Sequence, residues 1–195
     1  MAFLQDLDRD FLLALNGSHT STLDPIFWFI SQPKTWILVY LVLLVTVIWR
    51  YRSSQWIWVL ASFGLMLFLC DFVVTHGIKN TIQRLRPSHE PGLQALLHLL
   101  PEANGNLYKG GKFGFFSSHA SNHAGLVTLY LLWMRPLAKH WCILLIVWAL
   151  LVSYSRIYLG VHYPSDILSG LLYGTIVAVL LHLLFRRFIH PSTIT

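Results

Sequence analysis

Side chains that can bind and transfer a phosphate gather at the ends of apolar segments in this chain of 195 residues. Cations, hydroxyls and helix N-termini at one depth form a site for an anion. Histidine and carboxylate side chains add proton transfer and nucleophilic attack, and the whole set fits a phosphoryl group best. The residues of this candidate site are Lys79, Arg86, Ser117, Ser118, His119, Arg156, His162 and Asp166.

The spacing of these residues supports their grouping. Lys79 and Arg86 are seven positions apart, which puts both on one face of a helix if the helix continues past Lys79, and Pro87 then ends it. His162 and Asp166 are four positions apart at the expected start of a helix. A carboxylate there can accept a hydrogen bond from one ring nitrogen, which leaves the other nitrogen available to attack phosphorus.

Two of these segments resemble the outer signatures of type-2 phosphatidic acid phosphatases. The run KNTIQRLRP at 79–87 matches the first signature, which is a lysine, six residues and Arg-Pro. The run SRIYLGVHYPSD at 155–166 matches the third, which is Ser-Arg, five residues, a histidine, three residues and an aspartate. The middle signature, normally Pro-Ser-Gly-His, reads Phe-Ser-Ser-His at 116–119, so its proline and glycine are replaced.

The resemblance implies a metal-independent phosphatase without a cofactor, which forms a phosphohistidine intermediate. It implies that His162 is the nucleophile, that Asp166 orients and polarises this ring, and that His119 is the general acid. The groups implied to hold the phosphate oxygens are Lys79, Arg86, Arg156, Ser117 and the backbone N–H of Ser118. The change from glycine at position 118 matters if the turn needs a backbone conformation that only glycine adopts.

Composition places this chemistry in a membrane. Hydrophobic residues make up 55% of the chain, charged residues only 11%, and the mean hydropathy is +0.59. Soluble domains average roughly 25% charged residues, so a soluble globule and a disordered chain are both excluded. The net charge of +6 suits anionic headgroups rather than nucleic acid. Cys70 and Cys142 lie in apolar runs. We therefore expect both to pack as small buried hydrophobic residues and not to form a disulfide framework. No protein partner is implied.

Five apolar segments are expected to span the membrane, each needing about 20 residues. An apolar stripe at helical spacing precedes them over 3–15 and ends at Asn16-Gly17, a typical helix end. We interpret it as an interfacial helix, and the alternative is a sixth, irregular span over 10–30. The fold class is therefore an all-α polytopic membrane helix bundle with five to six membrane helices, in a single domain over 1–195. The five segments are about 35–49, 55–78, 119–133, 141–159 and 166–185.

Basic residues in short connections predict the orientation. The positive-inside rule places the connections that contain them on the cytoplasmic side. The opposite face then carries the 79–118 connection and the 155–166 turn, and with them the whole candidate site. We therefore expect a bacterial inner-membrane protein whose active site faces the periplasm. The basic residues concerned are Arg50, Arg52, Arg135, Lys139, Arg186 and Arg187.

The substrate expected from the resemblance is a lipid phosphate whose tail stays in the bilayer. Short bacterial proteins of this kind often convert undecaprenyl pyrophosphate to undecaprenyl phosphate for cell-wall biogenesis, so this is the first expectation, by analogy. Phosphatidylglycerophosphate, phosphatidic acid and lipid A phosphate are the alternatives. An anion transporter and an inactive lipid-binding scaffold are hypotheses of another class, but a transporter does not need two histidines and an aspartate at these spacings.

Other polar residues have structural interpretations beside functional ones. His119 and His123 are four positions apart, like a metal-binding pair, but no third ligand accompanies them, so His123 is expected to support or pack. Asp71 is expected to make a hydrogen bond between helices rather than relay protons. Arg84 is expected off the face that carries Lys79 and Arg86, where it has either a structural role or a contact with headgroups or substrate. His98 is expected to be solvated or interfacial.

Overall fold

The computed structural model describes residues 2–51, 54–135 and 138–189, and within these ranges every regular element is a helix. The prediction of an all-α bundle is confirmed. Arg52, one of the basic residues used to predict the orientation, lies outside the described residues. In chain order the elements are α1 (Ala2–Gly17), α2 (Leu23–Ser31), η1 (Pro33–Trp36), α3 (Ile37–Arg50), α4 (Gln55–Leu67), η2 (Phe68–Ile78), α5 (Lys79–Ile82), η3 (Pro87–His89), η4 (Gln94–Leu96), α6 (Ser118–Trp133), α7 (Lys139–Tyr158), α8 (Pro164–Phe185) and η5 (Arg186–Phe188).

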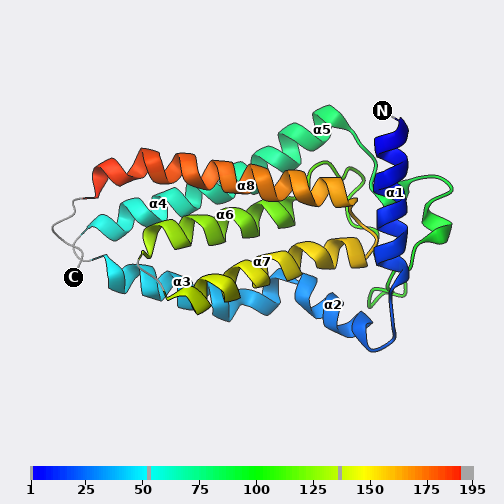
Figure 1. Ribbon diagram of the computed structural model, residues 1–195, viewed down its shortest axis with the longest axis horizontal. Coiled ribbons are helices and arrows are strands. Elements are labelled where there is room, and N and C mark those ends of the chain that lie inside the picture. Colours follow the sequence, from blue (N-terminus) through cyan, green and yellow to red (C-terminus); the bar gives the residue numbers. More distant parts are fainter. Residues whose placement is uncertain (1, 52–53, 136–137, 190–195) are drawn as a thin grey trace.

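Four helical stretches are long and apolar enough to cross a membrane. Each of the five segments expected to span coincides with a helix, but α6 has 16 residues and is only about 24 Å long. This helix occupies the middle of the bundle and packs against α4, α7 and α8 (Figure 1). The count of five to six membrane helices stays a prediction. The four stretches are Pro33–Arg50, Gln55–Ile82, Lys139–Tyr158 and Pro164–Phe188.

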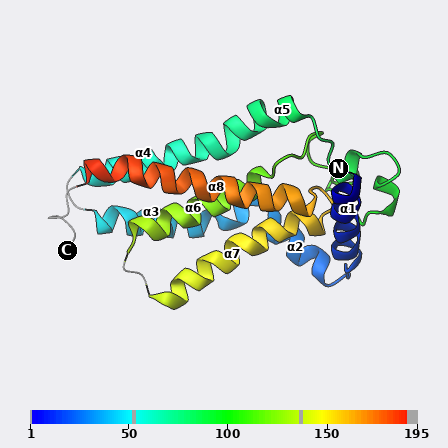
Figure 2. The same cartoon turned by 45° about the horizontal axis from the view of Figure 1, so that its top comes forward.

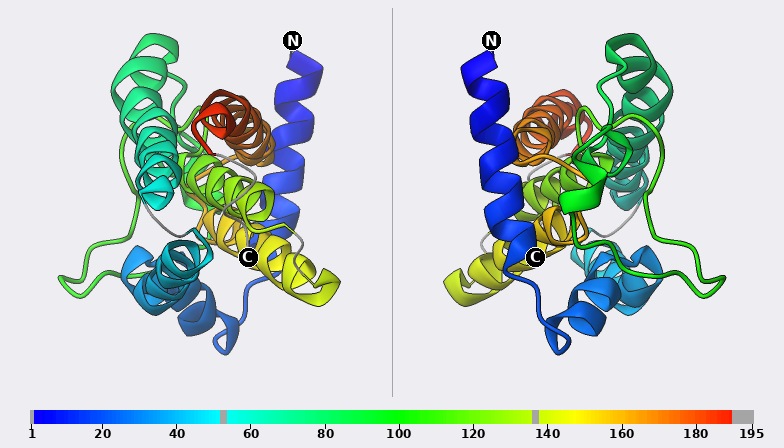
Figure 3. Two further views of the ribbon diagram at one scale, coloured as in Figure 1. Left: turned by 90° about the vertical axis from the view of Figure 1, so that its left-hand side faces the viewer. Right: turned by 90° about the vertical axis from the view of Figure 1, so that its right-hand side faces the viewer.

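The N-terminal helix α1 lies across one end of the bundle rather than along it (Figures 1 and 3). Its Leu12 is fully buried against the bundle, whereas Phe3, Leu4 and Phe11 are exposed. The helix ends at Gly17 and α2 starts in a different direction, so residues 10–30 do not form one continuous span. This arrangement agrees with an interfacial α1.

Helices α6 and α8 are in close contact through two glycines of α8. A Cβ atom at Gly170 would lie 2.6 Å from the carbonyl oxygen of Ser117, and one at Gly174 would overlap the backbone of Ser121. Small residues four positions apart let two helix backbones approach in this way. As a result, the N-terminus of α6 lies beside that of α8, and the Ser117 N–H donates to the Asp166 carbonyl at 3.0 Å.

The long connection between α5 and α6 packs over the same end of the bundle (Figure 2). Its base is closed by two backbone hydrogen bonds, from Arg86 N–H to Lys112 at 3.1 Å and from Gly114 N–H to Arg84 at 2.9 Å. Its Leu93 is buried against α1 and the ends of α7 and α8. The connection is therefore a packed cap and not an open loop.

Candidate active site

The eight predicted site residues meet at the end of the bundle that α1 and the long connection cover. They come from α5, the start of α6, the end of α7, the α7–α8 turn, the start of α8 and the connection that follows α5. His119 is partly exposed, and the other seven side chains are buried. The sequence-based grouping therefore corresponds to one place in the structure.

One expected detail is wrong: Lys79 and Arg86 do not share a helical face. Helix α5 ends at Ile82, and Gln83 adopts a left-handed conformation with φ of 52°. Its N–H still donates to the Lys79 carbonyl at 2.9 Å, which closes the last turn of the helix. Because the chain turns at Gln83, four residues before Pro87, Arg86 enters the site from an extended segment.

Ser118, at the start of α6, replaces the expected glycine without backbone strain. Ser117 is the N-cap, and its hydroxyl accepts a hydrogen bond from the Ala120 N–H at 3.4 Å. Within the described ranges the one non-glycine residue with positive φ is Gln83, so Ser118 does not need a glycine conformation. The Ser118 hydroxyl also accepts a hydrogen bond from Lys79 Nζ at 2.9 Å, a contact that glycine cannot make.

Three buried cations form the centre of the site. Arg86 donates to the backbone carbonyls of Phe113 at 3.2 Å and Val161 at 3.4 Å, and Arg156 donates to the Tyr108 hydroxyl at 2.6 Å. Burial, and then the charge of Arg156, lower the pKa of Arg86 to about 10, so that it stays protonated at neutral pH. Among the described residues, neither arginine nor Lys79 makes an ion pair. Such a group of cations favours binding of an anion.

The His162 ring presents two different nitrogens. Its Nδ1 lies 3.3 Å from Asp166 Oδ2, which also accepts the Tyr163 N–H at 3.1 Å. Its Nε2 is buried and has no hydrogen-bond partner among the described residues. Burial, and then the charges of Arg86 and Lys79, hold the pKa of His162 well below its usual value. The ring is therefore neutral at neutral pH, with Nδ1 carrying the proton toward Asp166.

His119 and His162 interact with the same positive charges. The charges of Lys79, Arg86 and Arg156 repel a proton on either ring, and the two rings also interact electrostatically with each other. Next along α6, His123 has both ring nitrogens occupied, one by the His119 carbonyl at 2.9 Å and the other by the Tyr40 hydroxyl at 3.2 Å. These contacts agree with a supporting role for His123.

A cleft of about 380 Å³ opens beside His119. Its polar members include Asp71 and Asn122, which are joined by a hydrogen bond of 3.4 Å from Asn122 Nδ2 to Asp71 Oδ1. The predicted contact of Asp71 with a neighbouring helix is therefore present. Asn122 Oδ1 is buried without a hydrogen-bond partner in the described part of the chain. The remaining lining residues are Pro33, Tyr40, Leu67, His123 and Leu126.

Asp166 has a second partner that the sequence does not indicate. Arg84 donates to Asp166 Oδ1 at 2.8 Å and to Asp8 Oδ2 of α1 at 2.6 Å. Asp8 Oδ1 in turn accepts the Ser165 N–H at 2.9 Å. The N-terminal helix is thus connected to the site carboxylate. The sequence shows Arg84 only as a basic residue two positions before Arg86. Nothing in the local sequence indicates that its partner is Asp8, 76 positions away.

The chain is similar to a known protein family and to named relatives. The family profile described as the PAP2 superfamily matches residues 55–190. A lipid A 4'-phosphatase of Porphyromonas gingivalis is 30% identical over 193 residues, which is 99% of this chain and 78% of that protein. A lipid A 4'-phosphatase of Bacteroides thetaiotaomicron is 30% identical over 174 residues, 88% of this chain and 74% of that protein.

The fold is also similar to a solved structure. The crystal structure of a transmembrane PAP2-type phosphatidylglycerolphosphate phosphatase from Bacillus subtilis superposes with a TM-score of 0.69 at 23% identity. The superposition covers 98% of this chain and 90% of that one. The resemblance seen in the two outer signatures is confirmed, and the chain belongs to the PAP2 superfamily.

Proposed function

We propose that this protein is a membrane lipid phosphatase that works through a phosphohistidine intermediate on His162, with no metal or cofactor. The observation that carries the proposal is the buried Nε2 of a neutral His162, which has no partner among the described residues while Nδ1 faces Asp166. A nucleophilic imidazole needs this arrangement. The surrounding cations can neutralise the oxygens of a phosphoryl group, as its transfer requires.

The first half of the reaction transfers the phosphoryl group to the enzyme. The phosphate oxygens lie among Lys79, Arg86 and Arg156. The Nε2 lone pair of His162 forms a bond to phosphorus, and the bond from phosphorus to the lipid oxygen breaks. His119 donates a proton to that leaving oxygen, while Asp166 stabilises the positive charge that develops on the His162 ring.

The second half regenerates the enzyme. A water molecule attacks phosphorus, and His119, now neutral, accepts its proton. The bond between nitrogen and phosphorus breaks, its electron pair returns to His162 Nε2, and phosphate leaves. His119, protonated in this second step, then serves as the acid of the next turnover.

The substrate we propose is the phosphate monoester of a lipid with a sugar headgroup, of the lipid A type. The similarity over 99% of this chain is to a protein named for that substrate. In addition, the cleft beside His119 contains hydrogen-bonding groups of Asp71, Asn122 and Tyr40, which suit the hydroxyls of a sugar. Undecaprenyl pyrophosphate, the first expectation from the sequence, is the second candidate because three cations also suit a pyrophosphate.

A substrate panel tests the proposal. Protein purified in detergent is incubated with lipid A, undecaprenyl pyrophosphate, phosphatidylglycerophosphate or phosphatidic acid, with and without a metal chelator. We expect fastest phosphate release from lipid A, no effect of the chelator, loss of release in His162→Ala, and full release in His140→Ala, whose exposed ring lies outside the site.

Other outcomes contradict parts of the proposal. Activity that disappears with the chelator contradicts the histidine mechanism, and a preference for undecaprenyl pyrophosphate contradicts the substrate. Phosphate uptake into vesicles without hydrolysis indicates a transporter. Lipid binding without hydrolysis by the wild type, unchanged in His162→Ala, indicates a scaffold.

We further propose that the protein lies in the bacterial inner membrane as a single domain over 1–195 and that its site faces the periplasm. The described basic residues Arg50, Arg135, Lys139, Arg186 and Arg187 support this orientation, because their elements end or begin at the end of the bundle opposite to α1 (Figure 1).

A further inference from the structure

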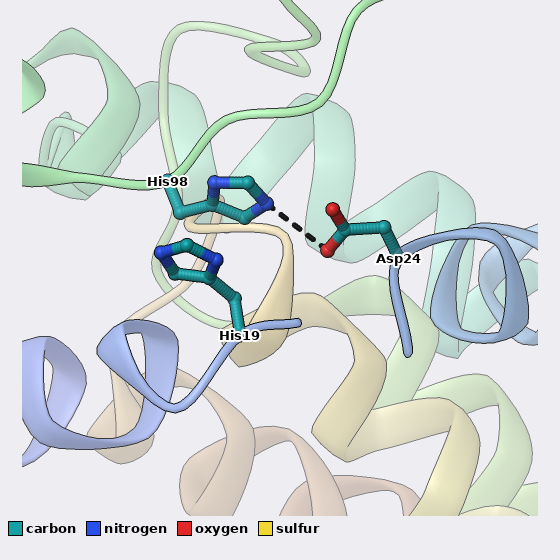
Figure 4. A group of neighbouring side chains, drawn as sticks. All are labelled: His19, Asp24 and His98. Atoms are coloured by element: carbon teal, nitrogen blue, oxygen red, sulfur yellow. Dashed lines mark hydrogen bonds and ion pairs between the residues drawn. The ribbon is translucent and has the colours of Figure 1, made fainter. Parts of the chain in front are cut away.

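A second group of chemically active side chains lies near the same end of the molecule, outside the active site. His19 follows α1, Asp24 lies in the first turn of α2, and His98 belongs to the long connection. Their candidate ligand atoms all lie within 4.8 Å of one another. Figure 4 shows the two imidazole rings stacked, with the carboxylate beside one end of the stack. We propose that these three residues bind a divalent transition-metal ion of the Zn²⁺ type.

The donor set fits this class of ion. Two imidazole nitrogens and one carboxylate oxygen are ligands that Zn²⁺ accepts, and the open side leaves a position for water. His98 Nε2 already lies 3.0 Å from Asp24 Oδ1. The His19 and His98 rings are 3.6 Å apart and nearly parallel, with an interplanar angle of 5°. Ligand atoms on tetrahedral zinc are about 3.3 Å apart, so the three ligand atoms must move closer together and the exposed His19 ring must turn out of its stack on His98.

Buried residues hold two of the three ligands in place. The Tyr158 hydroxyl donates to Asp24 Oδ1 at 2.6 Å. The Asn16 side chain accepts the His98 N–H at 2.8 Å and donates to the His98 carbonyl at 3.0 Å. It also donates to the Tyr158 carbonyl at 2.7 Å. Both supporting side chains are almost completely buried. Such outer contacts orient the ligands of a metal and strengthen its binding.

The ion would join three parts of the chain that meet over the active site. His19 and Asp24 belong to the α1–α2 segment, His98 to the long connection, and Tyr158 to the end of α7. The same connection carries Tyr108, which accepts the hydrogen bond of Arg156. The metal would therefore stabilise the cap over the site but take no part in the phosphate chemistry, so its removal by a chelator should lower the melting temperature while phosphate release below that temperature continues.

Cobalt binding tests the site directly. Protein with its affinity tag removed is made metal-free, and Co²⁺ is titrated while its visible absorption is recorded; Zn²⁺ then competes for the same site. We expect one bound equivalent in the wild type, and binding at least tenfold weaker in His19→Ala. Tyr158→Phe should weaken binding about 10- to 100-fold through loss of its contact with Asp24. The exposed His140→Ala serves as the matched control and should bind as the wild type does.

A second measurement separates loss of the site from loss of the fold. Zn²⁺ should raise the melting temperature of the wild type and of His140→Ala but not that of His19→Ala, while all three melt alike without metal. If the wild type binds Co²⁺ no more tightly than His19→Ala, the site does not exist. Because neither readout uses phosphatase activity, this result is independent of the proposed function.

Discussion

The positive charges around His162 disfavour protonation of both histidines of the site. This keeps His162 neutral, as its proposed role as nucleophile requires, but it works against the proposed role of His119, which must begin as an acid. A bound phosphate dianion reverses the second effect, because its negative charge favours a protonated imidazole. In this mechanism the substrate itself therefore prepares the acid that expels its lipid.

This balance predicts how activity depends on pH. Because the pKa of His162 is lowered, its neutral form persists as the pH falls through the ordinary histidine value of 6.5. The acidic limb of kcat/KM, which reports groups of the free enzyme, should therefore lie below pH 6.5. Rates of phosphate release measured from about pH 4 to 8 check the prediction. A limb at or above pH 6.5 that stays in place for substrates whose phosphate groups differ in pKa would show that His162 titrates like an exposed histidine.

Arg84 is expected to act as a positioning residue for Asp166. Arg84→Gln removes a hydrogen bond to a charged group, worth about 1.5–3 kcal/mol, so kcat should fall about 10- to 100-fold with little change in KM. Asp8→Asn should have a smaller effect in the same direction, because Asp8 acts through Arg84 and Ser165. Initial rates over a range of lipid concentrations separate the two parameters.

The matched control for this prediction lies on the same helix. Asp10 is exposed on α1, so Asp10→Asn makes the same chemical change without a contact to the site. If this variant and Asp8→Asn lose kcat equally, α1 affects catalysis through its net charge and not through Arg84. A rise in KM alone would instead assign Arg84 to substrate binding.

The site residues differ in how far the sequence can predict them. Residues at a fixed spacing within one segment, such as His162 and Asp166, can be predicted because a hydrogen bond between them spans a single helix turn. The contact between Arg84 and Asp8 joins residues 76 positions apart, and no local pattern encodes it. The hydrogen bond from Lys79 to Ser118 was missed for the same reason, although both residues were expected in the site.

At the scale of elements, the contact between α6 and α8 sets the geometry of the site. Helix α6 carries His119 and the Ser117 cap, and α8 carries Asp166 in its first turn. The two N-termini lie side by side only because Gly170 and Gly174 have no side chains. The close packing of the middle of the bundle therefore determines the distance between His119, the proposed acid, and His162, the proposed nucleophile, at its end.

Gly174→Ala tests this dependence. Its Cβ would overlap the Ser121 backbone, which cannot move unless α6 and α8 separate. We expect a loss of about 1–3 kcal/mol in stability, as for other overpacked cores, together with lower phosphatase activity. Thermal unfolding in detergent and phosphate release measure the two effects. Gly64→Ala in α4 is the control, because no atom lies within 4 Å of its added Cβ; equal melting of the two variants would contradict the prediction.

The helices themselves were largely predictable, since apolar runs of sufficient length have few alternatives in a membrane. Their ends and irregularities were not. The π-helical stretch η2 within the helix Gln55–Ile82, and the left-handed turn at Gln83, depend on packing against α6 and on the path of the long connection. Irregular turns of this kind often occur near functional sites, where tertiary contacts override local preference.

At the scale of the whole molecule, the two ends of the bundle carry different elements and different charged residues. One end carries the site, α1 and the long connection, and the other carries the end of α6, the start of α7 and the end of α8 (Figures 1 and 2). Arg50, Arg135, Lys139, Arg186 and Arg187, the described residues on which the predicted orientation rests, belong to elements that end or begin at this second end. The positive-inside rule therefore predicts that this end is cytoplasmic. A membrane-impermeant reagent should therefore distinguish the two ends in intact cells.

Single cysteines at the two ends test the orientation. In a background in which the partly exposed Cys142 is replaced by alanine, Asn104→Cys on the long connection should react with an impermeant maleimide in intact spheroplasts. His140→Cys, near the start of α7, should react only after the membrane is permeabilised. Cys70 is fully buried and needs no replacement. The reverse pattern would place the phosphate site in the cytoplasm, where a lipid of the outer leaflet does not reach it.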